Sequence, residues 1–479
     1  MRRTRTTALV VLALLNVFTL AAGLVVASML PPRLAGLQIP VAAARAVVNA
    51  TPVLKPAGTS ATRPEATGLP TASGLAAMLR AALPSAATGS GVGIEVADEA
   101  TGQVLYAANA GTPATPASTT KVVTAVAALA VLGADARFTT TVRQVGGTVV
   151  LVGGGDPTLA VHSYPSSDYP RPATLAQLAA DTARALKAQG RHSARLGYDT
   201  RLFSGPAMAQ GWANVDISTG NVTPIAALEA DQGRLTPGGA LEDWDDPVNF
   251  NSRTADPVGM TVAAFAALLA QDGITVTGAP AETSAPASAP VLASVSSPQL
   301  AAIVEQMLQE SNNVIAEVLA RQLAIALRIP ATFTGAADAD MTELRRLGVT
   351  TPISLVDGSG LSPADAIAPE TLVRVLEVAA RTPRPRAAIT GLPVAGFTGT
   401  LSAGNSVFGA IDGPARGVVR AKTGNLATVA SLTGQVYDSS GRLLLFAIMA
   451  PRVPGAGQLQ QAANAIVAAA AGLAACGCS

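Results

Sequence analysis

Residues 118–132 read STTKVVTAVAALAVL, and the interpretation of the whole chain starts from this stretch. A run of small apolar residues behind Ser and Thr predicts a helix that begins near Ser118, because hydroxyl side chains cap helix N-termini. Ser118 and Lys121 are three residues apart, so they share one face of that helix. A lysine can serve as the base for a serine nucleophile if burial or a second cation lowers its pKa. The alternative is a capping serine with a solvated lysine one turn later.

The composition narrows the possible chemistry. The 479 residues carry 32 Lys+Arg and 31 Asp+Glu, a net charge of +1, which excludes a broad electrostatic nucleic-acid binder. Two His and two Cys are too few for the usual zinc clusters, so we expect neither a metal nor a cofactor. Of the lysines, only Lys121 follows a serine by three positions; the lysines are Lys55, Lys121, Lys187 and Lys422.

A second motif, Ser311-Asn312-Asn313, is set within the predicted helical region 298–327. A hydroxyl that can relay protons beside an amide that can hold a peptide bond suits acyl transfer. The alternative is a helix cap with no chemical role.

A third motif, Lys422-Thr423-Gly424, ends the strand-like segment GVVRAKTG, the first of three segments predicted to form successive antiparallel strands. A cation and a hydroxyl at this place suit the anionic end of a substrate. By itself the pair is also unremarkable on an edge strand.

In this order the three motifs match the S-x-x-K, S-x-N and K-T-G set of the penicillin-recognising serine enzymes. From about Leu75 to Ala450 the sequence resembles the D-alanyl-D-alanine carboxypeptidase/endopeptidases, the class C low-molecular-mass penicillin-binding proteins. Further stretches that look like blocks of that family are LVGGGDPTL (151–159), YDTRLFSGP (198–206), SNNVIAEVLARQLA (311–324), DGSGLSP (357–363), LPVAGFTGTL (392–401) and AKTGNL (421–426).

The resemblance implies an α+β fold: a penicillin-binding/β-lactamase-like catalytic domain with an antiparallel sheet flanked by helices, a helical subdomain and a large β-rich insertion. A hairpin around Thr101-Gly102 near the start and the three strands near the end agree with one sheet that joins both ends of the chain. We expect residues 75–136 and 294–475 to form the catalytic domain and residues 137–293 to form the insertion.

The resemblance also implies catalytic roles. Ser118 would attack the carbonyl between the two terminal D-alanines of a peptidoglycan stem peptide. Lys121 would accept its proton, kept neutral in part by the charge of Lys422. Ser311 would help pass the proton to the leaving amine, and water would then hydrolyse the acyl-enzyme.

Substrate-binding roles follow in the same way. Asn313 would hold the amide backbone of the substrate, and Lys422 and Thr423 would bind its terminal carboxylate. Gly424 would let the substrate backbone approach closely. The oxyanion would lie between the backbone N–H groups of Ser118 and Asn425.

The N-terminal segment predicts export. Arginines precede an apolar run from Ala8 to Leu30, which matches the roughly 20 residues needed to span a bilayer and favours a cytoplasmic N-terminus. We expect residues 1–30 to be an uncleaved anchor and residues 31–74 to be a Pro/Ala/Thr-rich linker, with the body at the extracytoplasmic face of the plasma membrane. The alternative is a signal cleaved near Ala42-Ala43-Ala44, which would release a secreted protein.

Together these features predict a membrane-tethered serine DD-peptidase, a carboxypeptidase, an endopeptidase or both. Its partners would be peptidoglycan peptides, with β-lactams as inhibitors that acylate Ser118. Two alternative functions are also consistent with the sequence. One is a β-lactamase, although no E-x-x-L-N segment follows Ser311. The other is a non-catalytic protein that binds muropeptides without turning them over.

Overall fold

The computed structural model describes residues 68–162, 169–236, 238–239, 241, 252–404, 407–409 and 413–477. The predicted anchor, residues 1–30, and most of the predicted linker lie outside these residues. Within the described part, no helix is both long enough and apolar enough to cross a membrane. The first helix of the described residues is α2 (Ala72–Ala82), where the Thr71 hydroxyl accepts a hydrogen bond from the N–H of Gly74.

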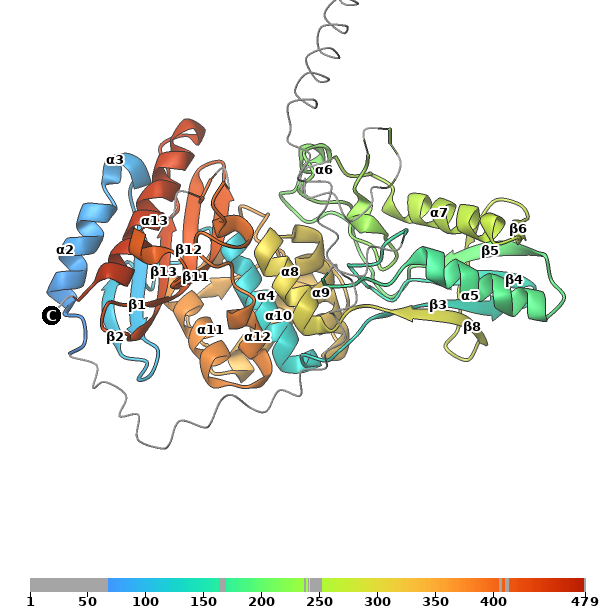
Figure 1. Cartoon of the computed structure of the whole chain (residues 1–479), viewed down its shortest axis with the longest axis horizontal. Coiled ribbons are helices and arrows are strands. Elements are labelled where there is room, and N and C mark those ends of the chain that lie inside the picture. The colour runs from blue at the N-terminus through green and yellow to red at the C-terminus, as the bar shows by residue number, and fades with distance from the viewer. Residues whose placement is uncertain are drawn as a thin grey trace, which may run out of the picture. The chain divides into compact units, whose positions relative to one another are not determined.

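A five-stranded sheet joins the two ends of the chain, with the strand order β11-β12-β13-β1-β2 and antiparallel neighbours throughout (Figure 1). The hairpin predicted around Thr101-Gly102 is the β1–β2 pair, and the three predicted late strands are the other three. The strands are β1 (Gly93–Asp98), β2 (Val104–Ala108), β11 (Val419–Leu426), β12 (Val429–Tyr437) and β13 (Leu443–Ala450).

Alternate residues of β13 face two different hydrophobic cores, because successive side chains of a strand point to opposite faces of a sheet. One set packs in the core that includes α2 and α13 (Leu459–Ala475), and the other in the core of the helical region. The set in the core with α2 and α13 consists of Leu444, Phe446 and Ile448. The set in the core of the helical region consists of Leu445, Ala447 and Met449. The sheet is therefore buried on both faces, and β11 forms one of its edges.

The helical region is built around α4 (Thr120–Leu132), the helix predicted from the opening stretch. Every residue from Thr120 to Leu129 is buried, as expected for a helix that is apolar all round. Because α4 is central, a lysine near its start is placed in the protein interior. The other elements of this region are α8 (Leu300–Glu310), α9 (Asn313–Ala326), α10 (Phe333–Arg346), α11 (Pro369–Arg381), α12 (Ala387–Thr390), β9 (Ile353–Ser354) and β10 (Ala366–Ile367).

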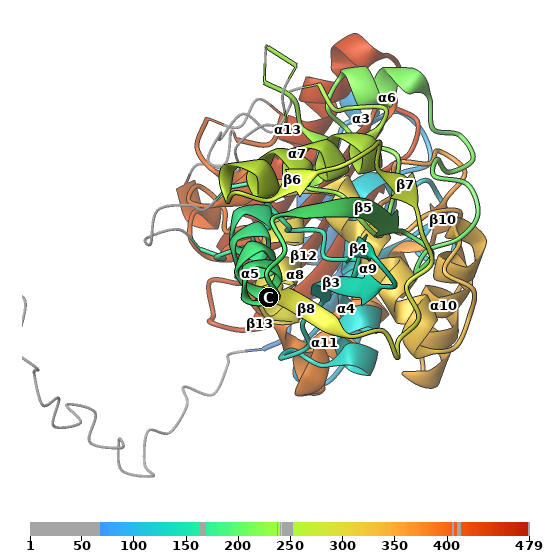
Figure 2. The same cartoon turned by 90° about the vertical axis from the view of Figure 1, so that its right-hand side faces the viewer.

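The inserted segment, residues 137–293 by sequence, folds on a second, mixed sheet with the order β6-β5-β4-β3-β8 and β7 paired to β5 (Figure 2). One helix of this segment is α5 (Leu175–Ala188). The long helix α7 (Pro257–Gln271) is not predicted, because its apolar residues are spread around its circumference and give little periodic signal. The remaining elements are β3 (Thr139–Val145), β4 (Thr148–Val152), β5 (Ser193–Asp199), α6 (Asn214–Ser218), β6 (Thr275–Val276), β7 (Ala281–Glu282) and β8 (Val291–Ser296).

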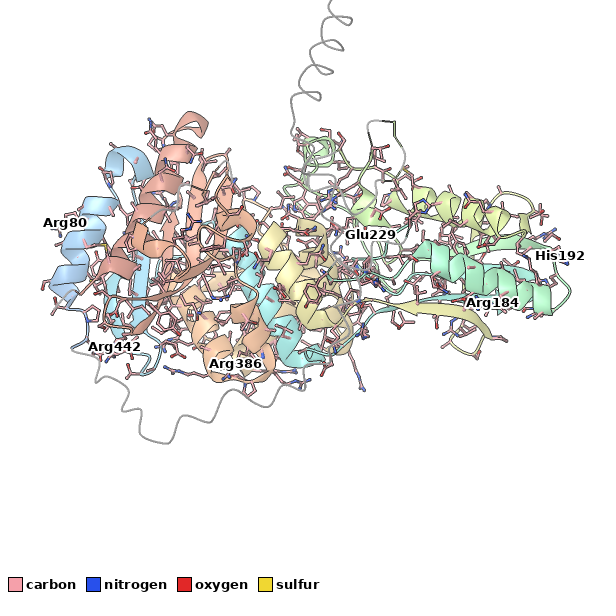
Figure 3. All side chains as sticks on the ribbon, viewed as in Figure 1. Arg80, Arg184, His192, Glu229, Arg386 and Arg442 are labelled. Atoms are coloured by element: carbon pink, nitrogen blue, oxygen red, sulfur yellow. The ribbon has the colours of Figure 1, made fainter. Side chains whose placement is uncertain are left out.

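The second sheet includes one strand that extends past residue 293. β8 pairs with β3 as far as Ser296, three residues past the predicted boundary at 293. Both histidines of the chain belong to this segment and are exposed: His162, and His192 in the turn between α5 and β5 (Figure 3). Neither histidine is among the residues that line the cavity described below.

Candidate active site

Ser118 sits in a tight turn directly before α4. A short 3-10 turn, Ala117–Thr119, precedes the helix, and Ala117 is fully buried with φ of 51°, a conformation that L-residues rarely adopt. Gly360 packs against this turn so closely that a Cβ atom there would lie 2.5 Å from the carbonyl carbon of Ala117. The turn that presents the Ser118 hydroxyl is therefore held in an unusual backbone geometry by its neighbours.

Lys121 is fully buried, and its ammonium nitrogen reaches three oxygen atoms. The Nζ atom lies 2.9 Å from Ser118 Oγ, 2.6 Å from Asn313 Oδ1 and 2.8 Å from the carbonyl oxygen of Ser359. Asn313 is the first residue of α9 and Ser359 belongs to the loop before β10. The predicted pairing of Ser118 with Lys121 is therefore present in the structure.

These three contacts determine where the lone pair of a neutral lysine points. A neutral amine has two N–H groups and one lone pair, whereas Asn313 Oδ1 and the Ser359 carbonyl can only accept hydrogen bonds. When both N–H groups serve those acceptors, the lone pair is left for Ser118, whose hydroxyl can donate. The geometry suits proton transfer from Ser118 Oγ to Lys121 Nζ.

The orientation of the Asn313 side chain is fixed from its other end. Its Nδ2 atom donates to the backbone carbonyl of Asn221, at 2.9 Å. Because that partner is an acceptor, the amide nitrogen must face Asn221 and the amide oxygen must face Lys121. Asn221 belongs to the inserted segment, so a part of the chain distant in sequence sets the position of a motif residue.

Burial lowers the pKa of Lys121 to about 7, because the charged form loses its hydration inside the protein. The carboxylates of Asp357, Glu317 and Asp365 act in the opposite direction and raise it. The partial contribution expected from the charge of Lys422 stays a prediction, because burial accounts for the lowered pKa of Lys121. At neutral pH a large share of Lys121 is in the form that can accept a proton.

Ser311 and Lys422 form the second half of the site. Ser311 ends α8 in a left-handed conformation with φ of 59°, which turns its side chain out of the helix. Lys422, on β11, is fully buried, and its Nζ donates to Ser311 Oγ at 2.9 Å and to the Thr423 carbonyl at 2.9 Å. Burial, and then the charge of Lys121, hold the pKa of Lys422 well below its usual range. Two buried lysines close to each other disfavour being charged at the same time.

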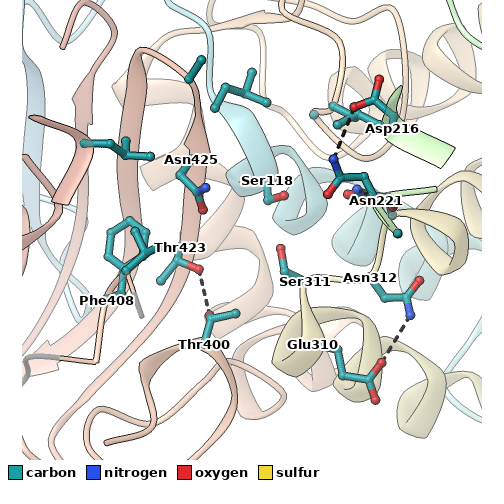
Figure 4. Close-up of a pocket in the computed structure, with 18 of the residues that line it drawn as sticks. Ser118, Asp216, Asn221, Glu310, Ser311, Asn312, Thr400, Phe408, Thr423 and Asn425 are labelled. Atoms are coloured by element: carbon teal, nitrogen blue, oxygen red, sulfur yellow. Dashed lines mark hydrogen bonds between the residues drawn. The ribbon is translucent and has the colours of Figure 1, made fainter. Parts of the chain in front are cut away.

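A cavity of about 560 Å³ opens over these residues (Figure 4). It is lined by five of the predicted residues, while Lys121 and Lys422 lie buried outside its lining. The five are Ser118, Ser311, Asn313, Thr423 and Asn425. The cavity wall also holds residues that the sequence did not single out, among them Asp216, Asn221 and Arg253 of the inserted segment, and Thr400.

Gly424 is not among the residues that line the cavity, and the structure gives it a packing role in addition to the one expected. A Cβ atom at this position would lie 2.7 Å from the carbonyl oxygen of Pro116 and 3.1 Å from the backbone nitrogen of Ser118. The missing side chain therefore lets β11 approach the turn that carries Ser118. Next to it, the Thr423 hydroxyl donates to Thr400 Oγ1 at 2.8 Å, which orients it at the cavity wall.

Asp357 organises the loop beside the nucleophile by accepting hydrogen bonds from several backbone N–H groups. Its Oδ1 atom accepts hydrogen bonds from the backbone N–H groups of Ser359 and Gly360, and its Oδ2 atom accepts one from Ser362. Oδ2 also accepts a hydrogen bond from Trp212 Nε1, at 2.8 Å. No sequence signal connects Trp212 to this loop, because the two are far apart in the chain and Trp212 belongs to none of the three motifs.

Comparison with known families matches residues 75–238 and 230–473 to the D-Ala-D-Ala carboxypeptidase 3 (S13) family. The chain belongs to this family. The match confirms the serine DD-peptidase assignment that rested on the three motifs, and it removes the reason to consider a β-lactamase. The α+β, penicillin-binding type of fold is confirmed as well.

Similar curated proteins include carboxypeptidase DacB of Mycolicibacterium smegmatis, which is 36% identical over 417 residues covering 85% of each chain. The D-alanyl-D-alanine carboxypeptidase of Actinomadura sp. strain R39 is 28% identical over 73% of this chain and 76% of its own length. Among solved structures, penicillin binding protein 4 of Haemophilus influenzae shares the fold, with a TM-score of 0.64, 24% identity, and coverage of 78% of this chain and 92% of that chain.

Proposed function

We propose that this S13 enzyme hydrolyses D-alanyl-D-alanine termini through an acyl-enzyme on Ser118, with neutral Lys121 as the base. The observation that carries the proposal is the set of contacts around Lys121 Nζ, in which two pure acceptors leave its lone pair for Ser118 Oγ. The hydroxyl proton moves to Lys121 as Ser118 Oγ bonds to the scissile carbonyl carbon. Backbone N–H groups of Ser118 and Asn425 would receive the negative charge on the carbonyl oxygen.

The leaving group would be handled by Ser311 and Lys422. Ser311 Oγ already accepts a hydrogen bond from Lys422, so its own proton is free to pass to the departing D-alanine amine, to be replaced from Lys121. The tetrahedral intermediate then collapses, the C–N bond breaks, and water later attacks the ester on Ser118. The proton taken from the nucleophile thus ends on the amine product.

The anionic end of the substrate would bind at Thr423 and Lys422. A carboxylate at this place favours the charged form of Lys422, whose pKa is low in the empty site. The new positive charge then disfavours protonation of Lys121, so binding of the correct end of the substrate helps to keep the base neutral. Asn313 donates one N–H to Asn221, which leaves the second N–H for a substrate carbonyl.

The test of this function is covalent labelling by a fluorescent penicillin, followed by mapping of the labelled peptide. We expect label on Ser118 and none in Ser118→Ala. A well-folded protein that takes up no label would contradict the proposal and favour the non-catalytic muropeptide-binding alternative. Product analysis with a stem peptide and with a cross-linked dimer then separates carboxypeptidase from endopeptidase activity.

We also infer that the enzyme works at the extracytoplasmic face of the plasma membrane, tethered by residues 1–30. This rests on the arginines that precede the apolar run from Ala8 to Leu30. Fractionation of cells that express the full chain, and a chain without residues 1–30, tests it. We expect the full chain in the membrane fraction and accessible to protease from outside; a full chain found only in the medium would indicate a cleaved signal instead.

A further inference from the structure

Both acceptors that orient Lys121 are connected to the inserted segment. One is Asn313 Oδ1, whose amide is held by the backbone carbonyl of Asn221. The other is the carbonyl oxygen of Ser359, which belongs to the loop that Asp357 organises. The inserted segment is therefore linked indirectly to the general base by two separate sets of hydrogen bonds, although it contributes none of the three motifs.

The second route passes through one indole group. Trp212 Nε1 donates to Asp357 Oδ2 at 2.8 Å, and Asp357 in turn holds the N–H groups on both sides of the Ser359 carbonyl. The indole ring is fixed by an edge-on contact with Phe333 of α10, at 5.1 Å between ring centroids. The N–H of Trp212 consequently has little freedom to leave Asp357.

We propose that Trp212 is a positioning residue for catalysis, through which the inserted segment holds Asp357, the Ser359 carbonyl and hence the lone pair of Lys121 in place. This inference rests on the proposed role of Lys121 as the base. The inserted segment would thus help to position the base that takes the proton from Ser118. A support of this kind matters because small displacements of a reacting group slow a reaction strongly.

Electrostatics predict the direction in which loss of the Trp212 N–H would change the pH dependence of acylation. The titratable groups around Lys121 are Asp357 and Asp365 from the loop, Glu317 from α9 and Lys422 from β11. A hydrogen bond from the Trp212 N–H disperses negative charge on Asp357. Without that bond, the carboxylate attracts the proton on Lys121 more strongly, so the base becomes neutral only at higher pH.

Trp212→Phe is the sharpest test, because phenylalanine keeps an aromatic ring against Phe333 and removes the N–H. The measurement is the second-order rate constant for acylation by a fluorescent penicillin between pH 5 and 10. We expect roughly tenfold slower acylation at pH 7 and a midpoint of the rising limb displaced to higher pH, with partial recovery of the rate at pH 9.

Gln322→Met is the matched control. Gln322 Nε2 donates to the carbonyl oxygens of Gly154 and Gly155, so this variant also loses hydrogen bonds between α9 and the inserted segment, without touching Asp357. We expect a lower Tm with an unchanged midpoint. A Trp212→Phe enzyme that loses stability in the same way and keeps the wild-type midpoint and rate would overturn the proposal.

If Trp212→Phe does not fold, Asp357→Asn tests the same connection. Asparagine has nearly the same shape as aspartate, but its amide nitrogen cannot accept hydrogen bonds. It could not replace Asp357 Oδ2 as the acceptor for the N–H groups of Trp212 and Ser362. We expect acylation to fall about 100-fold at every pH; a wild-type plateau rate would overturn the proposal. Failure of the wild-type enzyme to label at all would instead contradict the proposed function, so the two failures are distinguishable.

Discussion

Two of the basic side chains buried in this protein are Lys121 on α4 and Arg321 on α9, and burial affects them differently. Lys121 is fully buried and has an oxygen partner for each of its three possible contacts. Arg321, on α9, is 1% exposed, yet within the described part of the chain no atom accepts a hydrogen bond from its guanidinium. Instead its Cζ atom lies 3.9 Å from the centroid of the Phe333 ring.

The difference between the two sites follows from what each side chain can lose. A lysine relieves the penalty of burial by giving up its proton, and burial brings the pKa of Lys121 to about 7. An arginine keeps its charge, so the charge must be balanced by its surroundings. Glu317 and Glu229 supply this balance and counteract the lowering of the Arg321 pKa by burial. One buried cation can therefore work as a base, and the other can only support structure.

Lys121→Arg tests the comparison most severely. Arginine keeps a positive charge and cannot act as a base at neutral pH, so we expect acylation of Ser118 to fall about 1,000-fold. The measurement is the rate of labelling by a fluorescent penicillin, with circular dichroism to verify folding. The reciprocal variant, Arg321→Lys, is the control and should retain labelling. If folded Lys121→Arg labels at more than a tenth of the wild-type rate, a base other than Lys121 must act.

Arg321→Met should affect stability rather than the reaction. Burial raises the pKa of both Glu229 and Glu317 to about 8, and Arg321 counteracts this. Without the guanidinium both pKa values rise further, so the folded state holds its protons to higher pH than the wild-type fold does. The free energy of unfolding of Arg321→Met, compared with wild type, should therefore fall as the pH rises above about 8. We expect a loss of about 3 kcal/mol at pH 10 and little loss at pH 6. Urea denaturation at both pH values checks this; an equal loss at both would argue against the charge balance.

Glu229→Gln is expected to give the smallest effect, and a favourable one. Burial raises the pKa of Glu229 to about 8, although the charge of Arg253 and the backbone N–H of Ala226 act to lower it. Because the folded pKa lies above the unfolded one, the wild-type protein loses stability between about pH 4.5 and pH 8, whereas a glutamine does not titrate. Thermal unfolding should show a Tm gain that grows from pH 5 to pH 8 and reaches about 3 °C. A gain independent of pH would point to packing.

The sequence predicted the first of these two sites because its residues fall into motifs. Ser118 and Lys121 are neighbours on one helix, and the other two motifs resemble a known family, so their convergence follows from the fold. The helix that buries Lys121 was also predictable, since small apolar residues run without interruption from Val122 to Leu132 apart from Thr124. The role expected for Gly424 was incomplete, because the approach of β11 to Pro116 depends on tertiary packing.

The contribution of the inserted segment could not be read from the sequence. Asn221 acts through its backbone carbonyl, which any residue type would supply, so no residue pattern marks it. Trp212 acts through a single N–H towards a carboxylate that is far away in the chain. Arg321 looks like an ordinary polar position of the amphipathic segment NVIAEVLARQLAIA, and only the packing of α9 shows that it is buried.

The pH dependence of acylation in the wild-type enzyme tests the central claim most directly, because it reports the protonation of the base in the free enzyme. The second-order rate constant with a fluorescent penicillin would be measured from pH 5 to pH 11. The account predicts a rising limb with its midpoint at about 7, the pKa that burial gives Lys121. A midpoint near the ordinary lysine value of 10.5, or a rate that does not change with pH, would contradict a buried, neutral Lys121 as the base.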